Sequence, residues 1–221
     1  MSHKVHPKAF RIREIKDWDS RGFYEKNFAS YLKEDFEIRE FIKKKIKKFG
    51  LGKIEIERSP GKINIIIFTA RPGLVIGRAG EGVERLIKEL RQKILKTKAP
   101  YNKRGGIKLD SKIEIREIKN IWLSALLVAQ LMAAQIEKRM PYRRVLKKTL
   151  SKIMSQKGAK GARLEVAGRL NGISIARREW LQKGLLPRQT LRADIDYARD
   201  TAFCSYGAVG IKVWIYKGER F

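Results

Sequence analysis

The stretch Pro72-Gly73-Leu74-Val75-Ile76-Gly77-Arg78-Ala79-Gly80-Glu81-Gly82 joins an apolar run to a segment with helical periodicity. Apolar residues then recur at helical spacing, at Val83, Leu86, Ile87, Leu90 and Ile94. A glycine-rich loop that opens onto a helix N-terminus presents backbone N–H groups and a positive dipole end to an anion. Gly77 and Gly80 allow a phosphate chain to come close because neither carries a Cβ, and Arg78 adds a positive charge. The stretch therefore predicts a loop that binds a phosphate backbone.

The Gly-x-x-Gly pattern is weak evidence by itself, since it occurs three times in this chain. The segment Gly158-Ala159-Lys160-Gly161 lies between a basic helix and a strand, where Gly158 is typical of a helix end. The segment 207–210 carries no charge and precedes a strand, which indicates a turn. Only Gly77-Arg78-Ala79-Gly80 joins an apolar segment to a helix start, so only this occurrence is predicted to bind.

The elements around this loop follow the order of a two-layer α/β unit. A helix is predicted from an Asp35 cap to a stop at Gly50, with the apolar stripe Ile38, Phe41, Ile42, Ile46 and Phe49. Alternating apolar residues predict strands over 54–56 and 63–67 with a turn at Ser59-Pro60-Gly61, and a further strand over 107–115 after the loop helix. Helix, strand, strand, glycine loop, helix and strand together resemble a KH-type RNA-binding domain, whose loop clamps backbone nucleotides.

The composition predicts a polyanionic partner. The 221 residues carry 51 Lys and Arg against 23 Asp and Glu, a formal net charge of +28. Such a chain repels itself unless a nucleic acid or an anionic membrane surface neutralises it. The longest apolar segment, Ile121 to Ala134, is interrupted by Ser124 and Gln130 and is too short to span a bilayer. Nucleic acid is therefore favoured over a membrane.

A reducing, cytoplasmic location is expected from two features. The single cysteine, Cys204, excludes an internal disulfide. The N-terminus lacks the apolar core of a secretory signal.

Three parts are predicted along the chain. Residues 1–15 form a basic arm that becomes ordered on a partner. Residues 16–119 form an N-terminal domain with the KH-type fold at about 35–118, and its aromatic residues before position 35 are expected to pack rather than to stack on bases. Residues 120–221 form a C-terminal domain. His3 and His6 lack Cys or acidic neighbours, so no metal site is predicted in the arm.

Two segments concentrate positive charge without any acidic residue. Arg91 to Lys108 contains seven basic residues and Gly105-Gly106, which indicates a cationic excursion that contacts RNA. Lys138 to Arg163 contains ten. Within the second segment, a helical wheel places Tyr142, Val145, Leu146, Thr149 and Ile153 on one side and Arg143, Arg144, Lys147 and Lys148 mainly on the other. An uncompensated cationic face costs stability by repulsion, so it predicts a polyanion held against it.

The C-terminal part is predicted to be a second α/β unit. An amphipathic helix over 119–139 precedes the basic helix, which is expected to begin around Pro141. Alternation at 164–166 and 173–175 around Asn171-Gly172 predicts a hairpin, and Glu179-Trp180-Leu181 a short irregular or helical piece. Strands are predicted over 191–197 and 211–215.

Catalytic chemistry is not supported by the pattern. Asp194, Asp196 and Asp200 are the one acidic cluster that could hold a hydrolytic metal, but charge pairing with Arg192 and Arg199 explains them more simply. No Gly-x-x-x-x-Gly-Lys-Ser/Thr phosphate loop is present. Cys204 has no histidine near it in sequence and is expected to be a packed small residue. No cofactor is predicted.

Several segments together resemble the small-subunit ribosomal protein S-three family (uS-three), bacterial type. They are Lys4-Val5-His6-Pro7, Thr69 through Gly77, Gly80 through Glu84, Arg143-Arg144, Gly158 through Gly161, Val166 through Leu170, Glu179-Trp180, Leu191 through Tyr197, and Tyr206 through Ile215. Family members commonly have glycines at the positions of Ala9 and Arg13, and a shorter segment at Lys96 to Gly106.

This resemblance implies a type-two KH domain (αββααβ) followed by a C-terminal α/β two-layer domain with a mostly antiparallel sheet. It also implies a place in the head of the small ribosomal subunit, with small-subunit rRNA, mRNA and the S-ten and S-fourteen families as partners. In the family, basic residues matching Arg143, Arg144 and Lys147 line the passage through which mRNA enters, and help to unwind it.

The main hypothesis is thus a non-enzymatic, structural RNA-binding protein of the ribosome. Further candidate contacts to rRNA are Lys4, Arg11, Lys103, Arg104 and Lys148. Two rivals stay open at this point: a free KH-domain regulator or assembly factor, and a nuclease or lyase that acts on nucleic acid.

Overall fold

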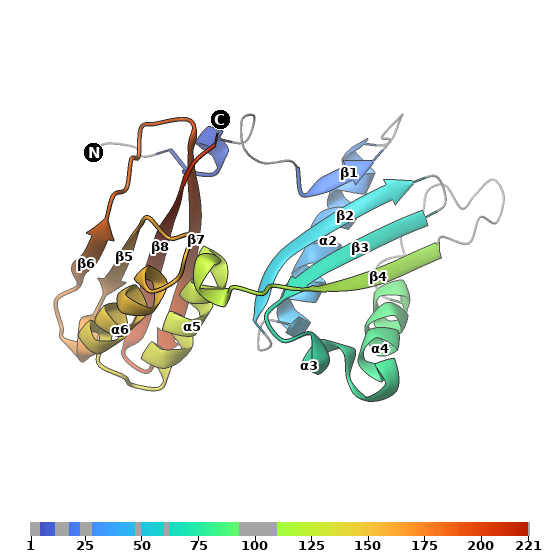
Figure 1. Ribbon diagram of the computed structural model, residues 1–221. Coiled ribbons are helices and arrows are strands. Elements are labelled where there is room, and N and C mark those ends of the chain that lie inside the picture. The colour runs from blue at the N-terminus through green and yellow to red at the C-terminus, as the bar shows by residue number, and fades with distance from the viewer. Residues whose placement is uncertain are drawn as a thin grey trace. The chain divides into compact units, whose positions relative to one another are not determined.

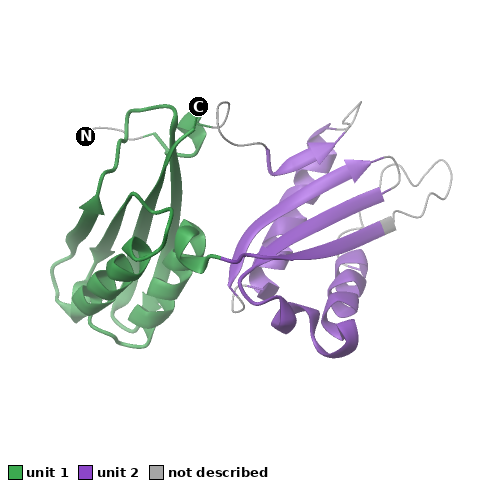
Figure 2. Ribbon diagram, viewed as in Figure 1, with its two compact units in different colours: residues 1–17, 120–221 green, residues 18–119 purple. Residues whose placement is uncertain are grey.

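The chain folds into two compact units. The computed structural model describes residues 5–11, 18–22, 28–46, 50–59, 62–92 and 110–220. Trp18–Lys119 form one unit, here named the glycine-loop unit, and Met1–Asp17 together with Asn120–Phe221 form the other, named the C-terminal unit (Figure 2). Among the described helices, none is both long and apolar enough to cross a bilayer.

The glycine-loop unit is a sheet with helices packed on one face (Figure 1). Its elements are β1 Ser20–Gly22, α2 Phe28–Ile46, β2 Leu51–Ser59, β3 Lys62–Thr69, α3 Pro72–Ile76, the 3-10 turn η3 Arg78–Gly80, α4 Glu81–Leu90 and β4 Asp110–Glu117. The sheet order is β1-β2-β3-β4, in which β2 and β3 are antiparallel and the other neighbours are parallel. The predicted order around the loop is therefore confirmed.

One apolar cluster joins all the helices of this unit to the sheet. Alternate strand residues such as Ile56, Ile65 and Ile67 meet Ile38 and Ile42 of α2 in this cluster. Val75 of α3 and Leu90 of α4 close it. The period-two pattern of the strands and the helical pattern of α2 therefore meet in one core.

One local prediction in this unit is wrong. The helix begins at Phe28 rather than at Asp35, which lies inside α2 and is only 1% exposed. Its carboxylate accepts hydrogen bonds from Arg58 and Ser20 in place of capping a helix. The segment before the helix contributes the short edge strand β1, which the sequence pattern does not reveal. Ile107 and Leu109, predicted to begin the last strand, lie outside the described residues.

The C-terminal unit is a fully antiparallel sheet covered by two helices, which lie side by side on one face (Figure 1). Its elements are η1 Ala9–Arg11, η6 Ile121–Leu123, α5 Ala125–Glu137, α6 Tyr142–Met154, β5 Gly161–Gly168, η7 Leu170–Gly172, β6 Arg177–Gly184, β7 Ala193–Cys204 and β8 Gly207–Glu219. The sheet order is β6-β5-β8-β7. Val128 and Met132 of α5 and Val145 of α6 pack against Leu164 and Val213 in the core.

The predicted hairpin after β5 is present, but the two-residue turn at Asn171-Gly172 and the strand over 173–175 are wrong. Asn171 and Gly172 lie in η7, and Ile173 and Ile175 are exposed. The partner strand of β5 starts only at Arg177, so Glu179-Trp180-Leu181 is strand and not an irregular piece. In this register Leu181 packs on the core. Its burial outweighs the local preference of Asn171-Gly172 for a two-residue turn.

Two acidic residues of β7, Asp194 and Asp196, form ion pairs with residues outside the predicted set. Asp194 pairs with Arg220, and Asp196 pairs with Lys8 and Lys217. Arg192 instead pairs with Glu219. Within the described residues, no group of three or more His, Cys, Asp or Glu side chains is placed to hold a metal ion.

Candidate nucleic-acid interface

The glycine loop connects α3 to α4 in a tight turn. Gly77, Ala79 and Gly80 have φ of 72°, 49° and 86°, so the chain passes through the left-handed region three times in four residues. Gly77 and Gly80 adopt this conformation without the clash that a Cβ causes. Arg78 and Ala79 are exposed at the tip. The loop thus presents backbone and one cation outward, as predicted.

Gly80 is the N-cap residue of α4, so no side chain at that position caps the first turn of the helix. The N–H groups at a helix start lack intrahelical partners, so they can bind an anion. Glu81 and Glu84 lie in the same turn, and the Glu81 carboxylate accepts a hydrogen bond from Arg85 at 2.6 Å. This pairing reduces the repulsion that a phosphate meets there.

A third glycine, Gly82, brings the two helices into contact, and the sequence pattern does not single it out. A Cβ at this position would lie 2.5 Å from the Val75 carbonyl oxygen and 2.9 Å from that of Ile76. The start of α4 therefore packs directly on the end of α3. This contact sets the shape of the loop between them.

We expect Gly82→Ala to lower the free energy of unfolding by about 1–3 kcal/mol, because the added methyl group overpacks two backbone carbonyls. Native-state hydrogen exchange of α3 and α4 amides measures the change. Gly73→Ala is the matched control, since a Cβ at Gly73 meets no heavy atom within 4 Å, and its effect should stay within about 0.5 kcal/mol. Equal effects of the two variants would contradict the close-packing role.

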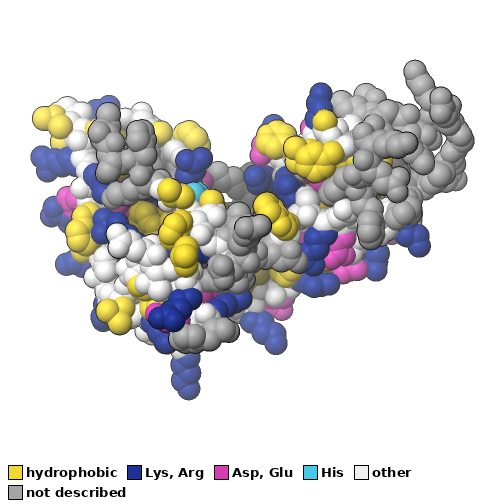
Figure 3. All heavy atoms as spheres, turned by 90° about the horizontal axis from the view of Figure 1, so that it is seen from above, with side chains coloured by type: hydrophobic (Ala, Val, Ile, Leu, Met, Phe, Trp, Pro, Cys, Tyr) yellow, Lys and Arg dark blue, Asp and Glu magenta, His cyan; other side chains and the backbone are white. Residues whose placement is uncertain are grey.

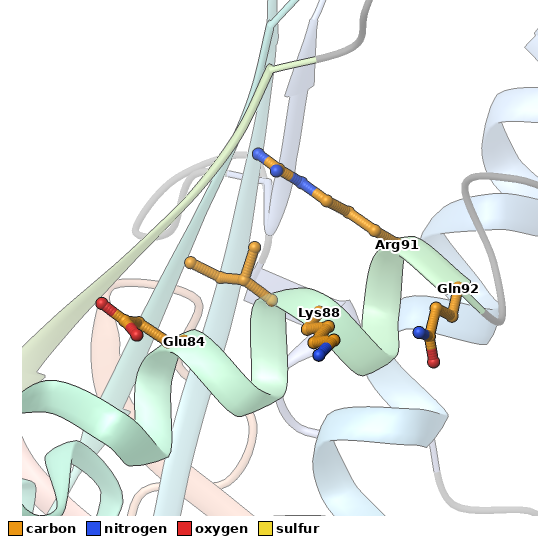
Figure 4. A pocket seen from close by; sticks show the side chains of 5 residues that line it. Glu84, Lys88, Arg91 and Gln92 are labelled. Carbon is orange, nitrogen blue, oxygen red and sulfur yellow. The ribbon is translucent and has the colours of Figure 1, made fainter.

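The far end of α4 borders a shallow pocket of about 500 Å³ (Figure 4). Arg91 points away from this helix toward β4, where its Nε donates to the Ser111 Oγ at 2.8 Å. The first cation of the Arg91–Lys108 segment thus fastens the end of α4 to the sheet. The rRNA candidates Lys103 and Arg104 of this segment, like Lys4, lie outside the described residues.

The helix α6 separates apolar and cationic side chains as the wheel predicts. Its buried residues are Tyr142, Val145, Leu146, Thr149, Leu150 and Ile153. Arg143, Arg144, Lys147 and Lys148 are all exposed, and these four residues are named the α6 cationic face. Among the described residues, Arg144, Lys147 and Lys148 form no ion pair. Figure 3 shows Lys and Arg side chains recurring over the visible surface of the described chain.

One acidic residue holds a single member of the α6 cationic face, a pairing that the sequence pattern does not predict. Glu179 of β6 accepts hydrogen bonds from Arg143 Nε at 3.3 Å and Nη2 at 3.1 Å. The Tyr142 hydroxyl donates to the same carboxylate at 2.7 Å. The hydrogen bonds from Arg143, and to a smaller extent the one from Tyr142, lower the pKa of Glu179. The Glu179 carboxylate in turn raises the pKa of Tyr142. Arg143 is therefore held by β6, while its neighbours on the helix are not.

Comparison with known proteins identifies both parts of the chain. Residues 37–123 match the family model described as KH domain, and residues 132–215 match the model described as Ribosomal protein S3, C-terminal domain. The small ribosomal subunit protein uS3 of Caldicellulosiruptor saccharolyticus is 50% identical over 220 residues, 99% of this chain and 93% of the relative. The chain belongs to the uS3 family.

Other members of the uS3 family match over the same length. The protein of that name from Oleidesulfovibrio alaskensis is 46% identical, and the one from Syntrophobacter fumaroxidans is 43% identical. Each match covers 99% of this chain and 96% or more of the relative. These matches confirm the predicted fold class, a KH domain followed by a C-terminal α/β domain with an antiparallel sheet.

Arg11, which is predicted to contact rRNA, is turned into the C-terminal unit in this structure. Arg11 is 3% exposed, and its Nη2 donates to the carbonyl oxygens of Arg188 and Thr190, both at 2.9 Å. Lys8 also pairs with Asp196 at 2.9 Å. Residues 5–11 of the predicted arm are thus ordered on the C-terminal unit of the same chain, because buried guanidinium groups require acceptors and this unit supplies them.

Proposed function

We propose that this uS3-family chain is a structural constituent of the small ribosomal subunit head, where it binds small-subunit rRNA and lines the passage through which mRNA enters. The α6 cationic face carries this proposal. It gathers Arg143, Arg144, Lys147 and Lys148 on one exposed helix face, where single-stranded phosphates can lie against them. Holding mRNA there assists the opening of its structure before decoding.

The glycine loop serves as a second contact in this proposal. Its backbone cradles single-stranded phosphates at the start of α4, and Arg78 anchors them by charge. Neighbouring head proteins of the S-ten and S-fourteen families complete the set of proposed partners, and the ribosome in the cytoplasm is the proposed location. No cofactor takes part.

Membership in a family of ribosomal structural proteins agrees with the prediction that the chain is not an enzyme. The experiment that tests the ribosomal role is sedimentation of small subunits after a high-salt wash. A structural constituent should stay with the subunit, whereas a free regulator or assembly factor should wash off. Cleavage of labelled RNA by the purified protein with divalent metal would instead support a nuclease.

The affinity of the purified chain for single-stranded RNA should fall steeply with salt. Each single-strand phosphate contact contributes a slope of about −0.7 in log affinity against log salt concentration, so four contacts from the α6 cationic face alone give about −3. Fluorescence anisotropy of a labelled RNA across a series of KCl concentrations measures this slope. A flat response would remove the electrostatic basis of the proposal.

A further inference from the structure

The face of the C-terminal sheet opposite α5 and α6 carries a different set of side chains. In β5, Leu164 and Val166 pack into the core with the helices, while Arg163, Glu165 and Ala167 alternate onto the opposite face. This opposite face, named the outer face, is used by neither the glycine loop nor the α6 cationic face.

A row of aromatic and cationic side chains crosses the outer face. Arg163 lies opposite Trp214 of β8, which lies opposite Tyr197 of β7. The Arg163 guanidinium carbon lies 4.0 Å from the ring centroid of Trp180 on β6 and 5.8 Å from that of Trp214. Arg163 is 8% exposed, whereas Trp180 is 50% exposed. Arg163 therefore supports one side of the Trp180 ring and leaves much of that ring open to solvent.

A hollow of about 390 Å³ lies beside this row. Its lining includes small residues of three neighbouring strands, Ala167, Gly210 and Thr201, together with Arg199 and Lys212. Glu165, which also lines the hollow, is directly opposite Trp180 in the sheet. The exposed Trp180 ring thus lies one strand away from a recess that contains the cations Arg199 and Lys212.

Buried Glu165 holds the cations around the hollow. Its carboxylate lies 3.4 Å from Arg163 Nη2, 3.2 Å from Arg178 Nε and 3.7 Å from Lys212 Nζ. Asp200, at the edge, accepts the N–H of Thr201 at 2.9 Å. The lining holds two cations, Arg199 and Lys212, and two carboxylates, Glu165 and Asp200. The positive excess comes from Arg163 and Arg178, which border the hollow through Glu165.

We propose that the Trp180 ring and this neighbouring hollow together form a second single-stranded RNA site, in which a base stacks on Trp180 and phosphates further along the strand bind Arg199 and Lys212. Aromatic rings beside a positively charged groove are the usual platform for unpaired nucleotides, because every base offers a π-face. An acidic protein segment would match the charge but would leave the exposed ring without a stacking partner. The site does not depend on the role of α6 with mRNA, since Trp180 and Glu179 alternate to opposite faces of β6.

The test uses the full chain carrying Arg143→Ala, Arg144→Ala and Lys147→Ala, so that the α6 cationic face does not dominate binding. Anisotropy compares a labelled adenosine 12-mer with an abasic 12-mer of equal charge. Adding Trp180→Leu to this triple variant should weaken binding of the adenosine 12-mer by about 5- to 150-fold. The affinity for the abasic 12-mer should not change. Trp180→Phe, which keeps a ring, should retain most of the affinity.

Two further variants make the result decisive. Arg199→Gln, a change at an exposed side chain, should reduce the salt slope by about 0.7 for both strands. Trp18→Leu is the matched control, since Trp18 is an exposed tryptophan of the glycine-loop unit, at 65%, and should change neither affinity. Equal losses for the adenosine and abasic strands, or no loss with Trp180→Leu, would overturn the proposal. Tighter Trp180-dependent binding of an oligoglutamate peptide would assign the hollow to an acidic protein instead.

Discussion

Replacing Asp35 by alanine should lower the free energy of unfolding of the glycine-loop unit by about 3–5 kcal/mol, the usual cost of leaving a buried charge without its partner. Asp35 Oδ1 accepts from Arg58 Nε at 2.8 Å and lies 2.6 Å from Arg58 Nη2. Its other oxygen accepts from the Ser20 hydroxyl at 2.8 Å. One carboxylate therefore ties β1, α2 and β2 together.

Glu34, the other acidic partner of Arg58, cannot replace Asp35. Glu34 Oε2 lies 3.1 Å from Arg58 Nη1, but burial raises the pKa of Glu34, and Arg58 only partly opposes that shift. Arg58 also lies over the Tyr31 ring at 5.0 Å, which keeps it away from water. Without Asp35, Arg58 stays buried with a weaker counter-charge.

Native-state hydrogen exchange of the β2 and β3 amides measures this loss for one unit of the two-unit chain, where a single global unfolding curve is ill defined. The control is Asp19→Ala, which removes an exposed partner of Lys53 at 3.0 Å and should cost at most about 1 kcal/mol. Asp35→Leu combined with Arg58→Met and Glu34→Gln should recover part of the loss, because this variant leaves no charge of the network buried without a partner. A loss for Asp35→Ala no larger than that for Asp19→Ala would contradict the network's role.

The elements that follow a local period could be predicted from the sequence. Alternating isoleucines in β2 and β3, and the buried positions of α6, need only the geometry of a strand or a helix to assign a face. The glycine loop was also predictable, because its place between an apolar run and a helix separates it from the other two matches to the pattern. The four cations of α6 are exposed for the same reason that its apolar residues are buried.

Contacts between residues far apart in sequence could not be predicted. Asp35 bonds to Arg58 across 23 residues, and Glu179 bonds to Arg143 across 36. Arg11 bonds to carbonyls more than 170 residues away. No local pattern marks such partners, so Asp35 resembles a helix cap and Arg11 a free cation in the sequence alone. The Asn171-Gly172 turn signal fails likewise, because the pairing of β5 with β6 decides where the strand begins.

Replacing Arg143, Arg144 and Lys147 together by alanine should impair translation through structured mRNA while leaving subunit assembly intact. Alanine favours the helix, and the buried side of α6 is untouched. The variant loses three positive charges that can meet phosphates, so its salt slope with single-stranded RNA should decrease by about 2. Small subunits reconstituted with the variant, tested on messages with and without a downstream hairpin, measure the effect on translation.

Two comparison variants separate loss of this face from loss of charge in general. Lys33→Ala, Lys43→Ala and Lys44→Ala remove the same charge from exposed positions of α2 and should leave the hairpin message unaffected. Glu179→Gln keeps all four cations but weakens the bonds that hold Arg143, so it should give a smaller defect of the same kind. Equal loss on the unstructured message, failed assembly, or the same defect from the α2 variant would count against a role for this face in mRNA entry. A hairpin-specific defect confined to the α6 and Glu179 variants can arise only from the position of these cations, because the α2 variant carries the same net charge as the α6 variant.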